Sequence, residues 1–265
     1  MRLVAALLSL VFQGGMLPLP PGPAAGSDLA ELRAGLDTLY AGDFARAAEH
    51  FALLATRDTT DPAPLVFEAS AYVWWAAARD SAGFEQARID SLLGAAIARA
   101  RAAGAAAEFW RATAHGYRAR ERDLHGHTWG AARDGKAMRD GYRRVLRAHA
   151  SCADCYLGLG VYHYGLARSS VLAKVVARIV GMGSGDADSA FAYLRRASAD
   201  GDLARVEAMW VLAAALVREA ERAPTAERRA ALVREARALV VELATRYPGN
   251  VVFGRFLAEL GGAPP

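Results

Sequence analysis

The sequence predicts an all-α protein in which successive helices form helix–turn–helix pairs. Apolar residues recur at spacings of three and four between short breaks of Gly, Asp and Pro, which is the period of an amphipathic helix. Alanine is abundant and favours helix, and no segment after residue 25 has the pattern of a strand array. At 265 residues, of which 54% are hydrophobic and 23% charged, the chain can bury a substantial core. We expect residues 26–265 to form one helical domain.

Residues 1–25 differ in composition from the rest of the chain. Arg2 precedes an apolar run over residues 3–12, and a Gly- and Pro-rich stretch follows and ends at Ala25. This order is typical of a cleavable secretory signal peptide. The run is about half as long as the ~20 residues of a membrane-spanning helix, although an uncleaved anchor that extends to Leu19 is an alternative. Because no cysteine near the cleavage region could carry a lipid, we expect an exported, periplasmic chain without a membrane span in its mature form.

The first two helices are expected directly after this segment. Asp28 can cap a helix that runs to Tyr40. Gly42 and Asp43 then form a turn into a second helix, and the two helices make one helix–turn–helix unit. The apolar stripe of the second helix consists of Phe44, Ala47, Ala48, Phe51 and Leu54.

The segment from Gly42 to Phe51 resembles the tetratricopeptide repeat, whose second helix carries a small residue and then an aromatic at the spacing of Ala47 and Phe51. Segments 131–136 and 156–164 are similar to a group of bacterial tetratricopeptide proteins of unassigned biochemistry. The repeat of that family, about 34 residues, leads us to expect four further pairs. Their first helices are expected at residues 62–78, 105–124, 153–167 and 203–221, and their second helices at 84–103, 128–148, 187–199 and 225–246. The resemblance implies a right-handed solenoid of about five helix pairs that serves as a binding scaffold.

The fourth pair contains an apolar insertion, residues 169–180, which the Gly-rich segment 181–186 follows. We expect the insertion to form an extra helix, with Lys174 and Arg178 on another side from its apolar stripe. One interpretation is that this helix docks on the protein's own core, and the other is that it forms a patch for self-association or for a membrane surface. A short last helix that ends near Leu260 would cover the end of the array.

Cys152 and Cys155 lie three positions apart at the break before the fourth pair. In an oxidising compartment this spacing favours a local disulfide. A redox-active pair would need a βαβ pattern around it, and a zinc site would need further ligands besides His149. Neither condition is met in the sequence, and two free thiols are the remaining possibility.

No residue pattern points to catalysis, to a metal or to a cofactor. His125 and His127 flank Gly126, which indicates a turn with polar ends, and no third ligand is near them in the sequence. The Gly-rich segment 181–185 lacks the strand context of a phosphate loop or nucleophile elbow. Basic residues, almost all arginine, are scattered beside acidic residues along the helices, so the net charge of +4 does not indicate nucleic-acid binding.

The strongest candidate for a binding surface is a stripe on the helix expected at 105–124. Arg111, His115 and Arg118 recur there at i, i+4 and i+7, beside Trp110. The two arginines could hold a carboxylate of an extended peptide, while aromatic side chains supply the contact area. A solvated helix face is the competing interpretation, as is core packing for the aromatics. Further aromatic candidates on first helices are Trp75, Tyr156 and Tyr164.

We therefore expect a non-catalytic scaffold whose concave face, lined by first helices, binds a protein or peptide of the cell envelope. The alternative is an envelope enzyme or small-ligand-binding protein that uses a cavity between the inserted segment and the first helices. An open groove lined by aromatic and arginine side chains would favour peptide binding. A deep enclosed pocket with convergent polar groups would favour the alternative.

Overall fold

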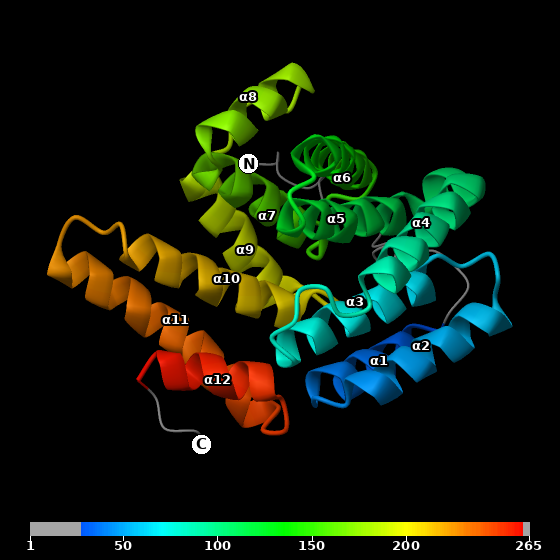
Figure 1. Cartoon of the computed structure of the whole chain (residues 1–265), viewed down its shortest axis with the longest axis horizontal. Helices are drawn as coiled ribbons and strands as arrows, with labels where there is room; N and C mark the ends of the chain where they lie inside the picture. Colours follow the sequence, from blue (N-terminus) through cyan, green and yellow to red (C-terminus); the bar gives the residue numbers. More distant parts are fainter. Residues whose placement is uncertain (1–27, 262–265) are drawn as a thin grey trace, which may run out of the picture.

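The computed structural model describes residues 28–261, and the expected signal peptide lies outside this range. The described residues form helices α1 to α12 and one short 3-10 helix, η1, with no strand among them (Figure 1). The all-helical prediction is therefore confirmed for this part of the chain. The helices are α1 (Leu29–Tyr40), α2 (Phe44–Arg57), α3 (Ala63–Ala78), α4 (Gln86–Ala103), η1 (Gly104–Ala107), α5 (Glu108–Leu124), α6 (Thr128–Ala148), α7 (Cys155–Arg168), α8 (Val171–Ile179), α9 (Ala187–Asp200), α10 (Arg205–Ala220), α11 (Ala226–Arg246) and α12 (Val251–Glu259).

Capping side chains mark the start of several helices. Asp28 accepts a hydrogen bond from a first-turn N–H group of α1, as the sequence predicts, and Asp43 of the predicted turn caps α2 in the same way. Gly42, between these two helices, has a φ of 96°, a conformation that glycine adopts without strain. The other helices that begin with such a side-chain cap carry it at Ser170, Asp186, Thr225 and Asn250. These local signals explain why the sequence indicates where helices begin.

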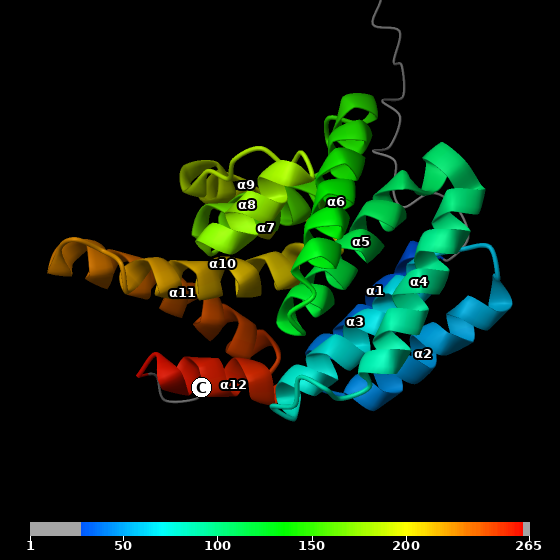
Figure 2. The ribbon, with the colours of Figure 1, turned by 45° about the horizontal axis from the view of Figure 1, so that its top comes forward.

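Neighbouring helices pack against each other along the whole described chain. The contacts run in order from α1 to α7, continue from α7 to α9, and then run in order to α12. The inserted helix α8 is the exception, because it contacts α6 and α7 and leaves α7 to pack on α9. Alternate helices also touch: α1 contacts α3, α3 contacts α5, and α5 contacts α7 (Figures 1 and 2). The first helices of the expected pairs thus lie side by side.

Aromatic side chains join the N-terminal and C-terminal parts of the chain. The ring centroid of Trp74 in α3 lies 5.6 Å from that of Trp210 in α10 and 5.5 Å from that of Phe253 in α12. Farther along the array, the Tyr117 hydroxyl of α5 donates a hydrogen bond to Glu207 of α10. First helices from the two halves therefore contact each other directly, and internal contacts occupy the face that would line the inside of an open array.

The last helix does more than cover one end of the array. Asn250 is 1% exposed, and its Nδ2 donates a hydrogen bond of 3.0 Å to the Tyr40 carbonyl at the end of α1, while its Oδ1 caps α12 by accepting from Val252 N–H. Gly42 lies so close to Gly249 that a Cβ added to it would be 2.6 Å from the Gly249 carbonyl oxygen. Helix α12 also contacts α3. The expected terminal cap is thus a closure between the two ends of the described chain.

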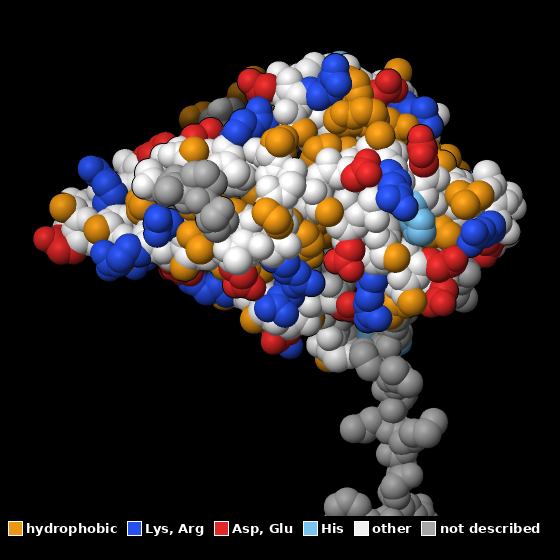
Figure 3. All heavy atoms as spheres, turned by 90° about the horizontal axis from the view of Figure 1, so that it is seen from below, with side chains coloured by type: hydrophobic (Ala, Val, Ile, Leu, Met, Phe, Trp, Pro, Cys, Tyr) orange, Lys and Arg blue, Asp and Glu red, His pale blue; other side chains and the backbone are white. Residues whose placement is uncertain are grey.

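The surface carries charges of both signs. Figure 3 shows one face of the molecule, on which basic and acidic side chains alternate with apolar ones. None of the helices within residues 28–261 combines the length and the apolar composition that crossing a membrane requires.

Candidate functional site

A surface groove of about 490 Å³ lies between α6, α7 and α9. Three arginines line it, Arg143 and Arg147 from α6 and Arg196 from α9, and all three are solvent-exposed. The volume falls in the usual range of ligand sites, but the exposed rim makes the groove open. Its remaining surface is apolar or aromatic, without an acidic side chain, and comes from Leu146, Tyr156, Leu159, Ala192 and Tyr193.

Helical spacing brings the arginines to the same opening as the tyrosines. Arg143 and Arg147 are four residues apart on α6, so they lie on one face of that helix. The Arg196 guanidinium carbon lies 4.3 Å from the centre of the Tyr156 ring, and the Tyr156 and Tyr193 ring centroids are 5.4 Å apart. Cation–π contact of this kind leaves the guanidinium N–H groups free to meet an anion. The groove therefore combines positive charge with aromatic contact area.

Two glycines on α7 allow the three helices to pack closely beneath the groove. A Cβ added to Gly158 would lie 2.0 Å from Cε2 of Tyr142 on α6. A Cβ added to Gly160 would lie 2.7 Å from Cγ of Leu194 on α9. Because larger residues at these two positions would push the helices apart, the glycines set the spacing of the groove walls.

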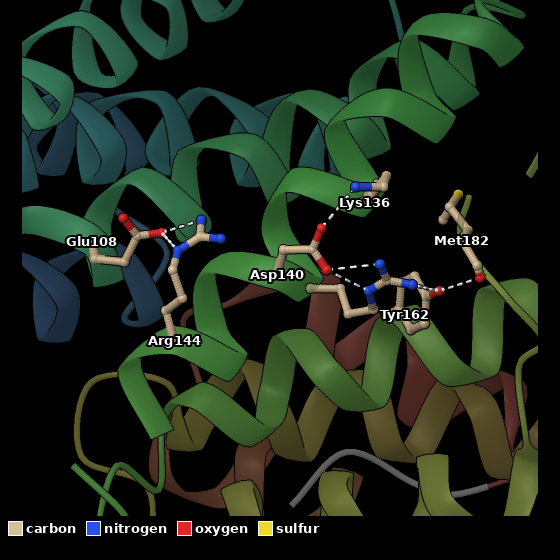
Figure 4. Close-up of polar contacts among 7 residues, drawn as sticks. Glu108, Lys136, Asp140, Arg144, Tyr162 and Met182 are labelled. Atoms are coloured by element: carbon tan, nitrogen blue, oxygen red, sulfur yellow. Dashed lines mark hydrogen bonds and ion pairs between the residues drawn. The ribbon is translucent and has the colours of Figure 1, made fainter. Parts of the chain in front are cut away.

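A chain of polar contacts fixes α6 to α7 and to the segment after α8. Asp140 forms ion pairs with Lys136, at 2.9 Å, and with Arg139, at 2.7 Å. Arg139 donates to the Tyr162 hydroxyl at 2.9 Å, and that hydroxyl donates to the Met182 carbonyl at 3.0 Å. Figure 4 shows this chain beside the separate pair of Glu108 and Arg144. These contacts hold the backbone of α6 in place without using the groove arginines.

The groove arginines differ from their sequence neighbours in having no carboxylate partner. Arg144 pairs with Glu108 at 2.7 Å, and Arg195 pairs with Glu235 at 2.8 Å. Arg143, Arg147 and Arg196 form no ion pair with any residue in 28–261. An arginine cluster without acidic partners holds a positive potential that attracts an anion. The arrangement can therefore bind carboxylates or another anionic group.

His163 follows the groove residues along α7, and the positive charge of the groove residue Arg143 affects its pKa. Burial lowers the pKa of His163, and the positive charge of Arg143 lowers this pKa further. Its Nδ1 is buried and has no hydrogen-bond partner among the described residues. His163 is therefore neutral near pH 7, and an anion bound at Arg143 would make its protonation easier.

The start of α7, directly before the groove residue Tyr156, is held by a disulfide and by hydrogen bonds to the segment before α10. Cys152 and Cys155 form a disulfide, with sulfur atoms 2.02 Å apart, as the sequence predicts. Asp154 accepts hydrogen bonds from three backbone N–H groups of residues 202–204, directly before α10, the closest at 2.7 Å from Asp202. Burial nevertheless raises the pKa of Asp154. The disulfide and this cap anchor the first turn of α7, from which Tyr156 projects.

The predicted stripe of Arg111, His115 and Arg118 lies at the contact between α5 and α6. Asp134 of α6 accepts a 2.7 Å hydrogen bond from His115 Nδ1 and another of 2.7 Å from Arg118, while Arg111 pairs with Glu108. Burial opposes ionisation of Asp134, but the hydrogen bonds from His115 and Arg118 prevail and lower its pKa. The three side chains share one face, as predicted, and each of them has a carboxylate partner within the protein. Their role in partner binding stays a prediction.

The predicted aromatic residues occupy different environments. Trp110 packs in the core, where its ring meets Phe67 edge-on. Because it is only 1% exposed, it offers no surface to a partner. Trp75 is half-buried between Tyr72 and Phe84. The Tyr164 hydroxyl donates to the Ala215 carbonyl of α10 at 3.2 Å. Of the four, only Tyr156 lines the groove.

The groove and the inserted helix lie at opposite ends of α6. Helix α8 leads to Met182, which packs near Gly135 in the first half of α6, whereas the groove uses residues 143–147 near its end. The groove is therefore not the cavity expected beside the insertion. Near His125 and His127, and elsewhere in residues 28–261, no group of three or more His, Cys, Asp or Glu side chains is placed to hold a metal ion.

Comparison with known proteins gives no family for this chain. No family model matches it, and neither the curated proteins nor the solved structures contain a match. The tetratricopeptide resemblance stays a prediction. The groove is therefore interpreted from its own chemistry.

Four groove residues do not stand out as binding candidates in the sequence: Arg143, Arg147, Tyr193 and Arg196. A signal was present, because Arg143, Leu146 and Arg147 follow the same i, i+3, i+4 spacing that drew attention to the stripe on α5. The spacing could not show which arginines have acidic partners. That difference depends on which helices become neighbours.

Proposed function

We propose that the protein is an exported binding scaffold that holds an acidic, extended segment of a partner protein in the groove between α6, α7 and α9. The observation that carries this proposal is the set of three arginines without acidic partners around an aromatic floor. Guanidinium groups bind carboxylates with two parallel hydrogen bonds. Tyr156 and Tyr193 supply the rigid contact area that anchors a peptide.

The shape of the groove favours a peptide over an enclosed small ligand. Its rim side chains are exposed, so an extended segment could enter and leave at both ends. The walls come from α6 and α9, which the sequence analysis assigns as second helices of consecutive pairs, and the floor comes from the first helix α7. The proposed surface is thus on the other side of the array from the concave face formed by first helices.

The proposal also includes the repeat architecture of the protein and its location in the cell. A right-handed tetratricopeptide solenoid of five pairs would place second helices on the outer side, which agrees with the position of the groove. The disulfide and the lack of a membrane-spanning helix in residues 28–261 are compatible with a periplasmic protein. We propose that it acts in a cell-envelope assembly, without catalysis, cofactor or nucleic acid.

A small anionic ligand is the second candidate. The groove volume of about 490 Å³ would accommodate a dicarboxylate or a similar molecule, and this observation favours that candidate. The binding experiment below distinguishes it from a peptide.

The proposal is tested by fluorescence anisotropy with a labelled decapeptide rich in Asp and Glu and with its Asn/Gln counterpart. The variant Arg143→Gln, Arg147→Gln, Arg196→Gln should lose about tenfold in affinity per arginine, because each lost charged contact corresponds to roughly 1.4 kcal/mol. Binding should also weaken with salt.

The matched control is Arg133→Gln, Arg234→Gln, Arg237→Gln, which removes the same charge from exposed positions outside the groove that, like the groove arginines, form no ion pair within residues 28–261. It should bind the acidic peptide nearly as well as the unchanged protein. Equal losses in both variants would reduce the effect to overall charge and contradict a specific site. A dicarboxylate that binds more tightly than the peptide would favour the small-ligand candidate.

A further inference from the structure

Helix α8 carries an apolar surface that the fold leaves uncovered. Val171 is 81% exposed, Leu172 69% and Ile179 65%, and Val175 is exposed as well. The same helix is attached to the protein through Val176 and Ala177, which are buried. Helix α8 therefore packs on α6 and α7, as one of the two interpretations of the sequence expects, but only one side of the helix makes this contact. Figure 1 places α8 at the edge of the molecule.

The exposed side of α8 is divided into two strips. At 100° per residue, Val171, Leu172, Val175 and Ile179 fall within about 100° of each other, and Lys174 and Arg178 fall within the next 60° or so. Neither Lys174 nor Arg178 has an acidic partner among the described residues. Asp186, the nearest acidic residue along the chain, accepts from Ser189 N–H at the start of α9. The aliphatic strip is therefore bordered by uncompensated positive charge.

We propose that α8 docks on an anionic lipid surface, with the aliphatic strip in the acyl boundary and the two cations at the headgroups. A helix with an apolar face, basic residues beside it and no spanning length lies in the plane of a membrane interface. Each Lys or Arg near an anionic surface adds to this attraction. An anionic lipid surface would cover the exposed aliphatic side chains and would place negative charge beside Lys174 and Arg178, which have no acidic partner among the described residues.

Two other occupants match the surface less well. An antiparallel symmetric contact between two copies would bring Lys174 and Arg178 near the same cations of the second copy. The nine residues of α8 also span only about 14 Å, which is small against the roughly 800 Å² per partner of a stable interface. The chain's own N-terminal segment, residues 1–27, contains no acidic residue to complement these cations.

The test is hydrogen exchange of the full chain with vesicles of pure phosphatidylcholine and with vesicles that contain phosphatidylglycerol. The anionic vesicles should slow exchange in the peptide that covers residues 169–182, because membrane contact stabilises α8. Exchange around Leu53, an exposed aliphatic residue on α2, serves as the internal control and should not change. The local readout separates α8 from any membrane contact made by residues 1–27.

Two variants define the contributions of charge and apolar surface. Lys174→Gln, Arg178→Gln should weaken the vesicle effect by about fivefold per cation removed. Leu172→Ser, Ile179→Ser should abolish it, while Leu53→Ser leaves it unchanged. Circular dichroism checks that each variant is folded.

Three results would overturn the proposal. The first is no change at α8 with anionic vesicles, and the second is the same change with both kinds of vesicle. The third is protection at α8 that rises with protein concentration without vesicles, which would assign the surface to a second copy. None of these results depends on peptide binding in the groove.

Discussion

The Asn250 side chain holds the two ends of the described chain together, and its contribution to stability can be worked out from its contacts. Its side chain has two hydrogen bonds, one to the Tyr40 carbonyl and one from Val252 N–H, both 3.0 Å long and buried. Asn250→Ala removes the cap of α12, which costs about 1 kcal/mol. It also leaves the Tyr40 carbonyl unpaired in the interior, which costs about 1–3 kcal/mol. We expect the free energy of unfolding to fall by about 2–4 kcal/mol in total.

Two further variants separate these contributions. Asn250→Ser keeps an oxygen for the cap but has no group that reaches Tyr40. The decrease in the free energy of unfolding of this variant therefore measures the contact with the Tyr40 carbonyl. Thr225→Ala removes the cap of α11, where Thr225 Oγ1 accepts from Arg228 N–H at the surface, and should cost about 1 kcal/mol. The assay is urea unfolding followed by far-UV circular dichroism. If Asn250→Ala costs no more than Thr225→Ala, the closure contact does not stabilise the fold.

Three other predictions concern the region of the groove. Gly158→Ala should destabilise the protein by about 1–3 kcal/mol in urea unfolding, because its new Cβ would meet the Tyr142 ring; an unchanged midpoint would contradict close packing there. Cys152→Ser, Cys155→Ser should lower the free energy of unfolding by about 2 kcal/mol, since the closed loop is short, and the variant should remain helical by circular dichroism; complete unfolding would show a larger structural role for the disulfide. Because the pKa of folded His163 lies below its unfolded value of about 6.5, the contribution of His163 to stability should be constant above that pH and should become unfavourable as the pH drops below it. His163→Gln should reduce this loss in a series of unfolding experiments at different pH, and an identical pH profile would assign the loss to other groups.

Local features of the fold could be read from the sequence because local physics sets them. The cap at Asp28 and the turn at Gly42 and Asp43 are properties of a few adjacent residues, and the structure shows each of them in place. The disulfide could be predicted for the same reason, because its two cysteines lie three positions apart. An inserted helix could also be expected, since its apolar stripe has a helical period.

The closure of the array and the groove depend on contacts between distant residues. Periodicity assigned Trp110 to a helix but did not distinguish a core position from a surface one, and its side chain is buried. The sequence also did not show which arginines would have acidic partners. Arg118 meets Asp134 across the α5–α6 contact, whereas Arg143 meets no acidic residue in the described chain. Only the packing of the helices determines which positive charges remain available.

Binding of an acidic peptide between α6, α7 and α9 is tested by locating the bound peptide on the protein. Backbone amide chemical shifts of the isotope-labelled protein would be followed by NMR as the acidic decapeptide is added. Binding in the groove should give saturable shifts around Arg143, Arg147, Tyr156, Tyr193 and Arg196, with little change around Arg111. Shifts concentrated around Arg111 and Arg118 would place binding on the α5 stripe and contradict the groove assignment, and the absence of saturable shifts would contradict peptide binding itself.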